Sequence, residues 1–162
     1  RSKRARRSRP ARPPDGVRIR PMTAEDAHVA HETHEETFKD MWGYAPMSFE
    51  DWRHWLLGDD HDWSLFFLAE ADGEPAGVAL CRPQPTEPDI GSIRVVGVRR
   101  PWRRKGVGRA LMLHAFAEFR RRAMRGAALG VDAESLTGAQ RLYASVGMHV
   151  DRESDIFERA LP

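Results

Sequence analysis

The chain has 162 residues, of which 41% are hydrophobic and 31% charged, so it is long enough for one domain with its own core. No apolar run approaches the roughly 18 residues that a membrane-spanning helix needs, and the first residues contain no apolar segment typical of a secretory signal. The single cysteine, Cys81, excludes an internal disulfide and lies in an apolar run, which predicts a buried thiol and a reducing cytoplasm.

The net charge of +2 hides an uneven distribution. Residues 1–14 hold seven Arg and Lys and no acid, whereas the rest of the chain holds 19 basic and 24 acidic residues. Because the first segment is poor in apolar residues, we expect a disordered tail or linker over 1–14 and one domain over 15–162. A nucleic-acid-binding tail is the alternative. We do not expect a nucleic-acid partner, because no aromatic residues alternate with the basic ones.

Hydrophobic periodicity predicts an α/β chain. Thr23 with Asp26, and Ser48, are typical helix starts, and Asp72-Gly73 is typical of a tight hairpin. The expected strands are 17–20, 63–71, 75–82, 92–98, 127–131 and 149–161, the last one irregular in its acidic middle. The expected helices run from 23 to about 40, from 48 to 58, from 106 to about 123, and from 135 or 137 to 147. This order predicts a mixed, mostly antiparallel central sheet with flanking helices.

One stretch, residues 95–111, combines a β-branched strand, a break at Pro101, two glycines and the start of a helix. The first N–H groups of a helix have no intrahelical partner and carry partial positive charge. Gly106 and Gly108 allow a phosphate to approach this backbone closely. The basic residues of the stretch are Arg103, Arg104, Lys105 and Arg109. The spacing is neither the dinucleotide fingerprint nor a P-loop. Local chemistry leaves open an anion site or a basic turn that caps a surface helix.

The segment Arg103-Arg104-Lys105-Gly106-Val107-Gly108 fits the pattern Arg/Gln-x-x-Gly-x-Gly/Ala. With the flanking Pro101-Trp102 and Ala110-Leu111, it resembles the acetyl-CoA pyrophosphate loop of the GNAT (Gcn5-related N-acetyltransferase) superfamily. Residues 129–148 resemble the later strand and helix of that family. The sequence around Trp102, 114–116 and 131–134 is similar to the C-terminal half of tandem-GNAT proteins of the mycothiol synthase type, which implies a second GNAT domain in a longer chain.

The resemblance implies transfer of an acetyl group from acetyl-CoA to an amine, without a metal. The loop would bind the pyrophosphate, and backbone groups of Val96 and Val98 would bind the pantetheine arm and the acetyl carbonyl. Tyr143 matches the tyrosine that protonates the CoA thiolate as general acid. Ser135 stands where relatives often have Asn, so that contact would be weaker or differently made. The predicted cofactor-binding residues are Val96, Val98, Arg103, Arg104, Lys105, Gly106, Val107, Gly108, Arg109 and Ser135.

A general base is not evident, because residues 92–95 of the strand before the loop contain no acid. Glu35 and Glu36 are the candidates, on the first predicted helix near the place where relatives bind the acceptor. Water relays or an amine of low pKa are alternatives. Gly97 indicates a bulge or a close backbone approach. We interpret it as a strand opening that admits the pantetheine arm, with a sheet distortion unrelated to a ligand as the alternative.

Three histidines, His28, His31 and His34, recur every third residue on the first predicted helix. We interpret them as a solvated polar face rather than a metal site, because three side chains at this spacing fan around a helix and no cysteine accompanies them. The aromatic residues between 38 and 55 are expected to be mostly core, with one or two lining an acceptor pocket.

The sequence therefore predicts an acetyl-CoA-dependent N-acetyltransferase that acts directly on a primary amine, of a small molecule rather than a protein, with no membrane partner. The alternative is a non-catalytic CoA-binding GNAT domain with a regulatory or structural role. Such a domain would bind CoA without turning over an amine.

Overall fold

The computed structural model describes residues 12–40, 43–58, 61–130, 143–152 and 156–161. In these ranges the strands are β1 (Val17–Pro21), β2 (Phe66–Ala71), β3 (Glu74–Pro83), β4 (Ile90–Val98), β5 (Gly126–Gly130), β6 (His149–Arg152) and β7 (Ile156–Ala160). The helices are α1 (Ala27–Phe38), α2 (Phe49–Leu57) and α3 (Val107–Arg121), with short 3₁₀ turns at Ala24–Asp26, Trp63–Leu65 and Arg100–Trp102.

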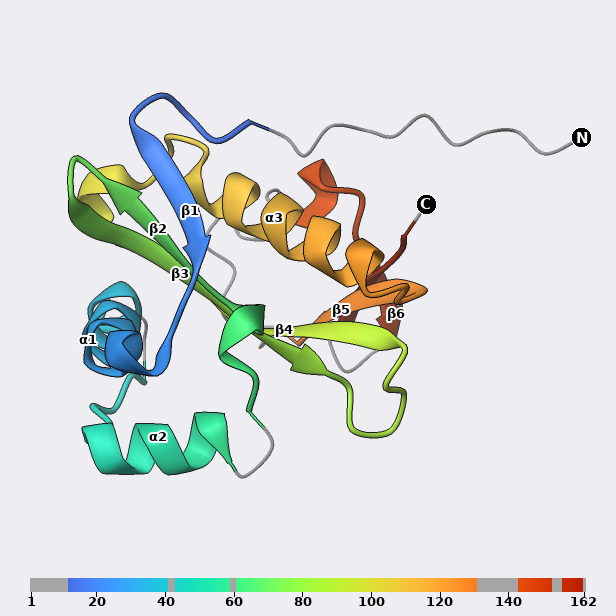
Figure 1. The fold of residues 1–162 in the computed structure, drawn as a ribbon, viewed down its shortest axis with the longest axis horizontal. Helices are drawn as coiled ribbons and strands as arrows, with labels where there is room; N and C mark the ends of the chain where they lie inside the picture. Colours follow the sequence, from blue (N-terminus) through green and yellow to red (C-terminus); the bar gives the residue numbers. More distant parts are fainter. Residues whose placement is uncertain (1–11, 41–42, 59–60, 131–142, 153–155, 162) are drawn as a thin grey trace, which may run out of the picture.

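The described strands form one sheet in the order β1-β2-β3-β4-β5-β7-β6. Neighbouring strands are antiparallel except β4 and β5, which run parallel. Helices α1 and α2 cover one face of the sheet and α3 crosses the other (Figure 1). The prediction of a mixed, mostly antiparallel sheet with flanking helices is therefore confirmed.

Each face of the sheet has its own core. The face toward α3 buries Phe67, Ile93, Leu111 and Phe116. The face toward α1 and α2 buries Trp52, Leu68 and Val95, among others. Side chains of one strand alternate between the two faces, so the central strands β2, β3 and β4 contribute to both cores. The predicted burial of Cys81 is confirmed, because its side chain is 1% exposed and lies in the α3-side core.

Local signals in the sequence explain several element ends. Ser48 accepts a hydrogen bond at Oγ from the N–H of Asp51, at 3.1 Å, and so caps α2 as predicted. Asp72 and Gly73 have φ values of 52° and 79°, the left-handed pair that a two-residue hairpin between β2 and β3 requires. Gly147, with φ 83°, ends the helical residues that follow Tyr143. The predicted start of that helix lies outside the described residues.

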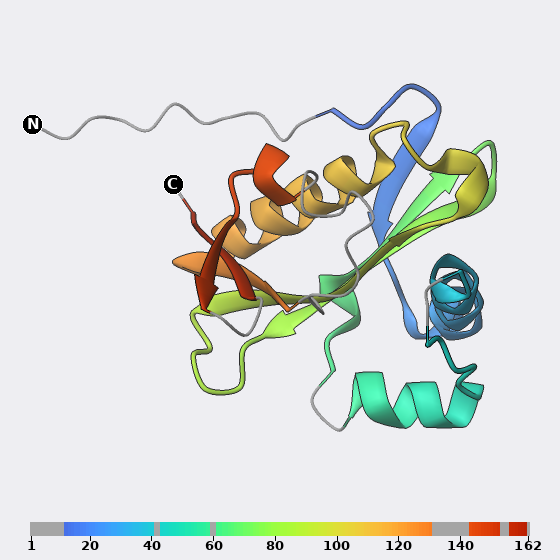
Figure 2. The same ribbon diagram turned by 180° about the vertical axis from the view of Figure 1, so that it is seen from behind.

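The closing strand expected over 149–161 is two strands in the structure, β6 and β7, which lie on either side of its expected irregular middle. They are antiparallel, and β7 lies between β5 and β6 (Figure 2). Strand β7 pairs with all five residues of β5, and β6 is the next strand outward. Within the described ranges, no helix has the length and apolar composition needed to cross a bilayer.

Candidate active site

The sheet opens between β4 and β5. These strands pair only from Ile90 with Gly126 to Ile93 with Leu129. Beyond Ile93, residues 94–98 of β4 have no partner on that side among the described strands. The register with β3 also shifts here, because Leu80 pairs with Val95 and Cys81 with Ile93, which leaves Arg94 as an extra residue. A bulge of this kind bends the strand and increases its twist, so β4 diverges from β5 at Arg94.

The predicted role of Gly97 needs correction. A Cβ at this position would lie 2.5 Å from Oγ1 of Thr37, which projects from α1. Glycine is therefore required because α1 packs directly on β4, on the face opposite α3. The strand does open as expected, but the divergence begins at the Arg94 bulge rather than at Gly97. Val96 and Val98, the predicted pantetheine-binding residues, lie on the open part of β4 with side chains packed against the α3-side core.

The basic loop after β4 forms a cradle of backbone N–H groups. Arg104 and Gly106 have φ values of 62° and 82°, and Gly106 is the N-cap of α3. The first backbone hydrogen bond of the helix joins the N–H of Ala110 to the carbonyl of Gly106 at 3.0 Å. The N–H groups of residues 107–109 therefore precede the helical ladder, and no acceptor for them occurs among the described residues.

Three exposed cations surround this helix end. Arg104, Lys105 and Arg109 are exposed and make no ion pair with any described residue. Full positive charges, free N–H groups and the partial positive charge of the helix all favour an anion at the same point. The residues present therefore fit the pyrophosphate of a coenzyme A.

Arg103, also predicted to contact the cofactor, is engaged within the protein. Its Nε donates to the carbonyl of Val98 at 2.9 Å, and one terminal nitrogen donates to the carbonyl of Thr37 at 2.9 Å. The other terminal nitrogen lies 3.5 Å from Asp40. Arg103 thus joins the end of β4 to the C-terminal end of α1, and its contact with the cofactor stays a prediction.

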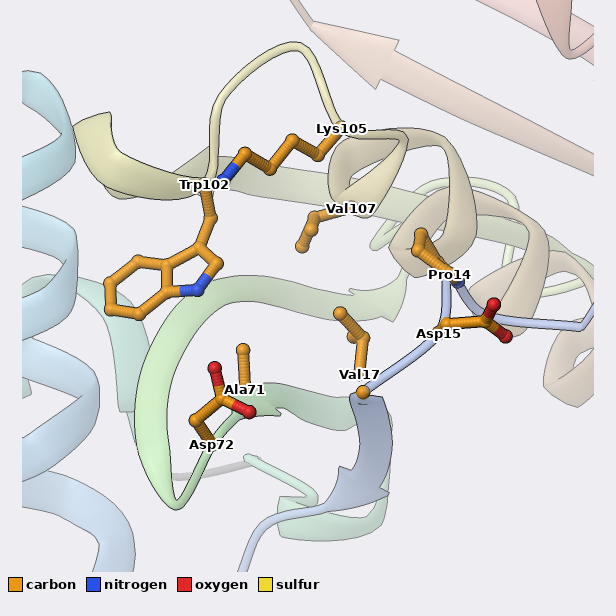
Figure 3. A pocket seen from close by; sticks show the side chains of 9 residues that line it. Pro14, Asp15, Val17, Ala71, Asp72, Trp102, Lys105 and Val107 are labelled. Atoms are coloured by element: carbon orange, nitrogen blue, oxygen red, sulfur yellow. The ribbon is translucent and has the colours of Figure 1, made fainter.

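A small pocket lies next to the loop, on the side of β1. Its lining includes Trp102, Lys105, Asp72 and Pro14 (Figure 3). The volume is about 150 Å³, about half the lower limit for ordinary small-molecule sites. The pocket is therefore too small for a nucleotide. Pro14, placed in the tail by the sequence, packs here against the position that a Gly106 side chain would occupy, with Cγ 3.4 Å away. The rest of the predicted tail, residues 1–11, lies outside the described residues.

Tyr143 is placed in the core on the α3 side of the sheet. Its side chain is 7% exposed and shares the α3-side cluster with Ile93 and Leu129, the last residues that pair β4 with β5. Burial raises the pKa of its hydroxyl, so the group carries its proton at neutral pH. Ser135 lies outside the described residues.

The two carboxylates considered as a general base are both engaged. Glu36 accepts from Nε of Arg99 at 2.7 Å. Glu35 accepts from the N–H of Met47 at 3.3 Å, and its second oxygen lies 3.8 Å from Nε2 of His31. The structure therefore brings neither one to the open edge of β4 as a free acceptor.

The interpretation of the three histidines as a solvated face is wrong for His31 and His34, which are partly buried, whereas His28 is exposed; all three rings nevertheless contact α2 or the residues just before it. The ring of His28 stacks on Phe49, with centroids 3.9 Å apart. His31 contacts the carbonyl of Met47 at 2.8 Å, and His34 accepts at Nδ1 from the indole N–H of Trp52 at 2.7 Å. Among the described residues, no group of three or more His, Cys, Asp or Glu side chains is arranged to hold a metal ion.

A family model described as the acetyltransferase (GNAT) family matches residues 27–148. This chain is a member of the GNAT family. Members of the family use acetyl-CoA. The match includes α1, the basic loop and Tyr143, so the elements that surround the opening in the sheet belong to the part that defines the family.

Individual relatives agree with this assignment. A mycothiol acetyltransferase from Thermobispora bispora is 34% identical over 141 residues, which cover 83% of this chain and 47% of the relative. A GCN5-related N-acetyltransferase structure from Sphaerobacter thermophilus matches with a TM-score of 0.77 and 33% identity, over 94% of this chain and 47% of that chain. This GNAT chain thus spans about half the length of these two relatives.

Smaller proteins share the fold over their full length. The PaiA N-acetyltransferase from Thermoplasma acidophilum, solved in complex with coenzyme A, matches with a TM-score of 0.70 and 19% identity, over 89% of this chain and 98% of that chain. At that identity the likeness concerns the fold alone. It indicates that one unit of this size makes a complete GNAT fold.

Proposed function

We propose that this domain transfers the acetyl group of acetyl-CoA directly to the primary amine of a small molecule. The observation that supports this is the placement of the basic, glycine-containing start of α3 directly after the strand that diverges from β5. A long ligand with an anionic end fits this arrangement, since the anion would lie on the helix N-terminus and the arm beside the open edge of β4.

Acetyl-CoA would supply an activated thioester. Free backbone groups of residues 94–98 would hold the arm and polarise the acetyl carbonyl, because an N–H aimed at the developing negative charge lowers the barrier. The amine nitrogen would attack the carbonyl carbon, the C–S bond would break, and the Tyr143 hydroxyl would give its proton to the leaving sulfur. Tyr143 is suited to this role because burial keeps its hydroxyl protonated.

For the base that accepts the proton of the amine, both candidate carboxylates already have partners in the structure. Glu35 is the better of the two candidates in this proposal, because its contact with Met47 is longer than the contact of Glu36 with Arg99. The absence of a free carboxylate near β4 among the described residues is also the observation that favours the alternative, a CoA-binding domain without turnover.

The two half-length matches further support a second GNAT domain in the same longer chain. A cytoplasmic location is part of the proposal, because a single cysteine allows no internal disulfide and suits a reducing compartment.

The decisive experiment is calorimetric titration with acetyl-CoA and CoA of the wild type, Gly106→Glu and Gly106→Ala. Both substitutions add a Cβ at a φ of 82°, so they share the backbone strain, and only glutamate places a carboxylate against the pyrophosphate. We expect at least about tenfold weaker binding in Gly106→Glu than in Gly106→Ala. Equal affinities in the two variants would refute the assigned cofactor site.

Turnover separates the enzyme from the binding domain. With an accepted amine, Tyr143→Phe should lower kcat by about 100-fold, since general acid catalysis contributes that much, with little change in acetyl-CoA affinity. Unchanged kcat would remove Tyr143 from the mechanism. Binding of acetyl-CoA with no turnover of any primary amine would favour the non-catalytic alternative.

A further inference from the structure

Arg94 lies at the point where β4 separates from β5. It is the extra residue of the β4 bulge and the first residue beyond the last β4–β5 pair. Its Nη1 donates to the carbonyl of Leu56 at 3.0 Å, so the side chain extends toward the C-terminal end of α2, on the face opposite α3. Its guanidinium carbon lies 4.8 Å from the centroid of the Trp55 ring. The same nitrogen, Nη1, lies 3.5 Å from the carbonyl of Trp55, so Arg94 is held beside the end of β4–β5 pairing by the carbonyls of α2 and one aromatic face.

The charge of Arg94 is not compensated. Burial lowers the pKa of its guanidinium, and the positive charge of Arg82 lowers it further. Among the described residues, no carboxylate pairs with either arginine, whereas Arg20, Arg99 and Arg122, which are also half-buried, each pair with an acid. Two neighbouring cations, one of them partly desolvated, are unfavourable unless an anion joins them.

Arg82 lies on the same face of the sheet. It pairs across β3 and β4 with Ser92. The residues on either side of Ser92 point toward α3, because a Cβ on Gly91 would contact Phe119 and Ile93 lies in the α3-side core. Cross-strand neighbours share a face, so Ser92 and Arg82 point toward α2, as Arg94 does.

Trp55 completes the surface. Its side chain is 49% exposed, the one large hydrophobic side chain that stands out as exposed in the described part of the chain. The ring of His34 lies beside it, with centroids 6.3 Å apart. An exposed aromatic face next to two unpaired guanidinium groups offers a wall for the apolar part of a ligand and donors for its anionic group.

We propose that Arg94, Arg82 and Trp55 bind a carboxylate or phosphate group of the acceptor, so that the substrate is an anionic primary amine. This inference rests on the proposed function and names its substrate class. The cofactor loop lies at the start of α3, whereas Arg94 lies beyond the last pair of β4 with β5 and extends toward α2. An acceptor held by these residues would approach the open edge of β4 from the α2 side and would not compete with the cofactor for the basic loop.

The first test uses inorganic phosphate and needs no turnover. Protein saturated with CoA, whose pyrophosphate occupies the loop, is titrated with phosphate by calorimetry and tryptophan fluorescence. We expect saturable binding that weakens at least about fivefold in Arg82→Gln and Arg94→Gln. Arg18→Gln, which removes an exposed arginine of the edge strand β1, is the control and should bind as the wild type. The exposed side chain of Arg82 makes no hydrogen bond or ion pair with a described residue, so that variant stays informative if Arg94→Gln is unstable.

The second test identifies the source of the anion. Phosphoethanolamine is compared with ethanolamine, and β-alanine with β-alaninamide, as acceptors. We expect the charged member of one pair to have about tenfold higher kcat/KM, and Arg94→Gln to remove that advantage; the pair that shows it distinguishes phosphate from carboxylate. Absence of phosphate binding, binding that ignores both arginines, or preference for the neutral amines would overturn the inference. Arginine-dependent phosphate binding without acetylation of any amine would overturn the transferase and leave the anion site in place.

Discussion

The contact between His34 and Trp52 predicts a specific dependence of stability on pH. His34 accepts the indole N–H at Nδ1 in the native state. Protonation would convert this nitrogen into a donor and break the bond. Burial, with a smaller effect from the charge of His31, lowers the pKa of His34 from 6.5 to about 4. The native state therefore resists protonation of this ring in a pH range where the unfolded chain accepts it.

The size of the effect follows from linkage. A difference of one pKa unit corresponds to about 1.36 kcal/mol, so the full shift sets an upper value of about 3 kcal/mol. Because the ring is only partly buried, we expect about 2 kcal/mol. Between pH 6.5 and 4 the unfolded state binds more protons than the native state, so the free energy of unfolding falls as the pH falls through this window. Above pH 7 and below pH 4 this contribution is constant.

Urea unfolding from pH 7.5 to pH 4.5, followed by circular dichroism, measures the effect. The comparison of wild type with His34→Gln isolates this ring, because the glutamine does not titrate and its carbonyl can still accept from Trp52. His114, whose pKa burial also lowers, contributes to both proteins and cancels. Asp26, with a pKa of about 2, loses its stabilisation only below this window. Exposed His54→Gln is the control. The same loss of stability in wild type and His34→Gln would refute the reasoning.

Three further predictions concern packing around the site. Gly97→Ala should lower the free energy of unfolding by about 1–3 kcal/mol, because its Cβ would lie 2.5 Å from Oγ1 of Thr37. Adding Thr37→Ala in a double variant should recover part of this loss. Additive losses in the double variant would contradict the contact. Cys81 should react with a disulfide reagent at least about 100-fold more slowly in the native protein than in urea. The reason is that its side chain is buried and that burial raises the pKa of its thiol. A rapid reaction of the native protein would disprove the burial. Arg103→Met should lower the free energy of unfolding by about 2 kcal/mol in chemical denaturation, because its hydrogen bonds to the carbonyls of Val98 and Thr37 are lost. Arg104→Met, at an exposed position, should lower it by less than about 0.5 kcal/mol. Equal losses in the two variants would argue against this role of Arg103.

Local signals predicted most of the fold. A cap such as Ser48 or a turn such as Asp72-Gly73 acts through neighbouring residues, so its chemistry is visible in the sequence. The basic loop belongs to the same class, because the helix start and its glycines are contiguous. The division of 149–161 into two strands was not predicted, because the pairing of β7 with β5, a strand from an earlier part of the chain, is a long-range contact.

Long-range contacts account for the misinterpreted residues. The spacing of three that joins His28, His31 and His34 recurs in Phe49, Trp52 and Trp55, and this match was the available signal that the two sets face one another. Gly97 was recognised as a point of close approach, but the sequence does not name Thr37 as the group that approaches. Arg94 carries no sequence signal, because its place depends on the register of β4 against β3.

Arg103 connects the proposed cofactor side of the domain with α1. One guanidinium holds the carbonyl that ends β4 and the carbonyl of Thr37 near the end of α1. Under the proposed function, a cofactor that stabilises the loop would therefore also stabilise the end of α1, beside the proposed acceptor side. Coupling of this kind is reciprocal, so the factor by which CoA would tighten acceptor binding equals the factor by which the acceptor would tighten CoA binding.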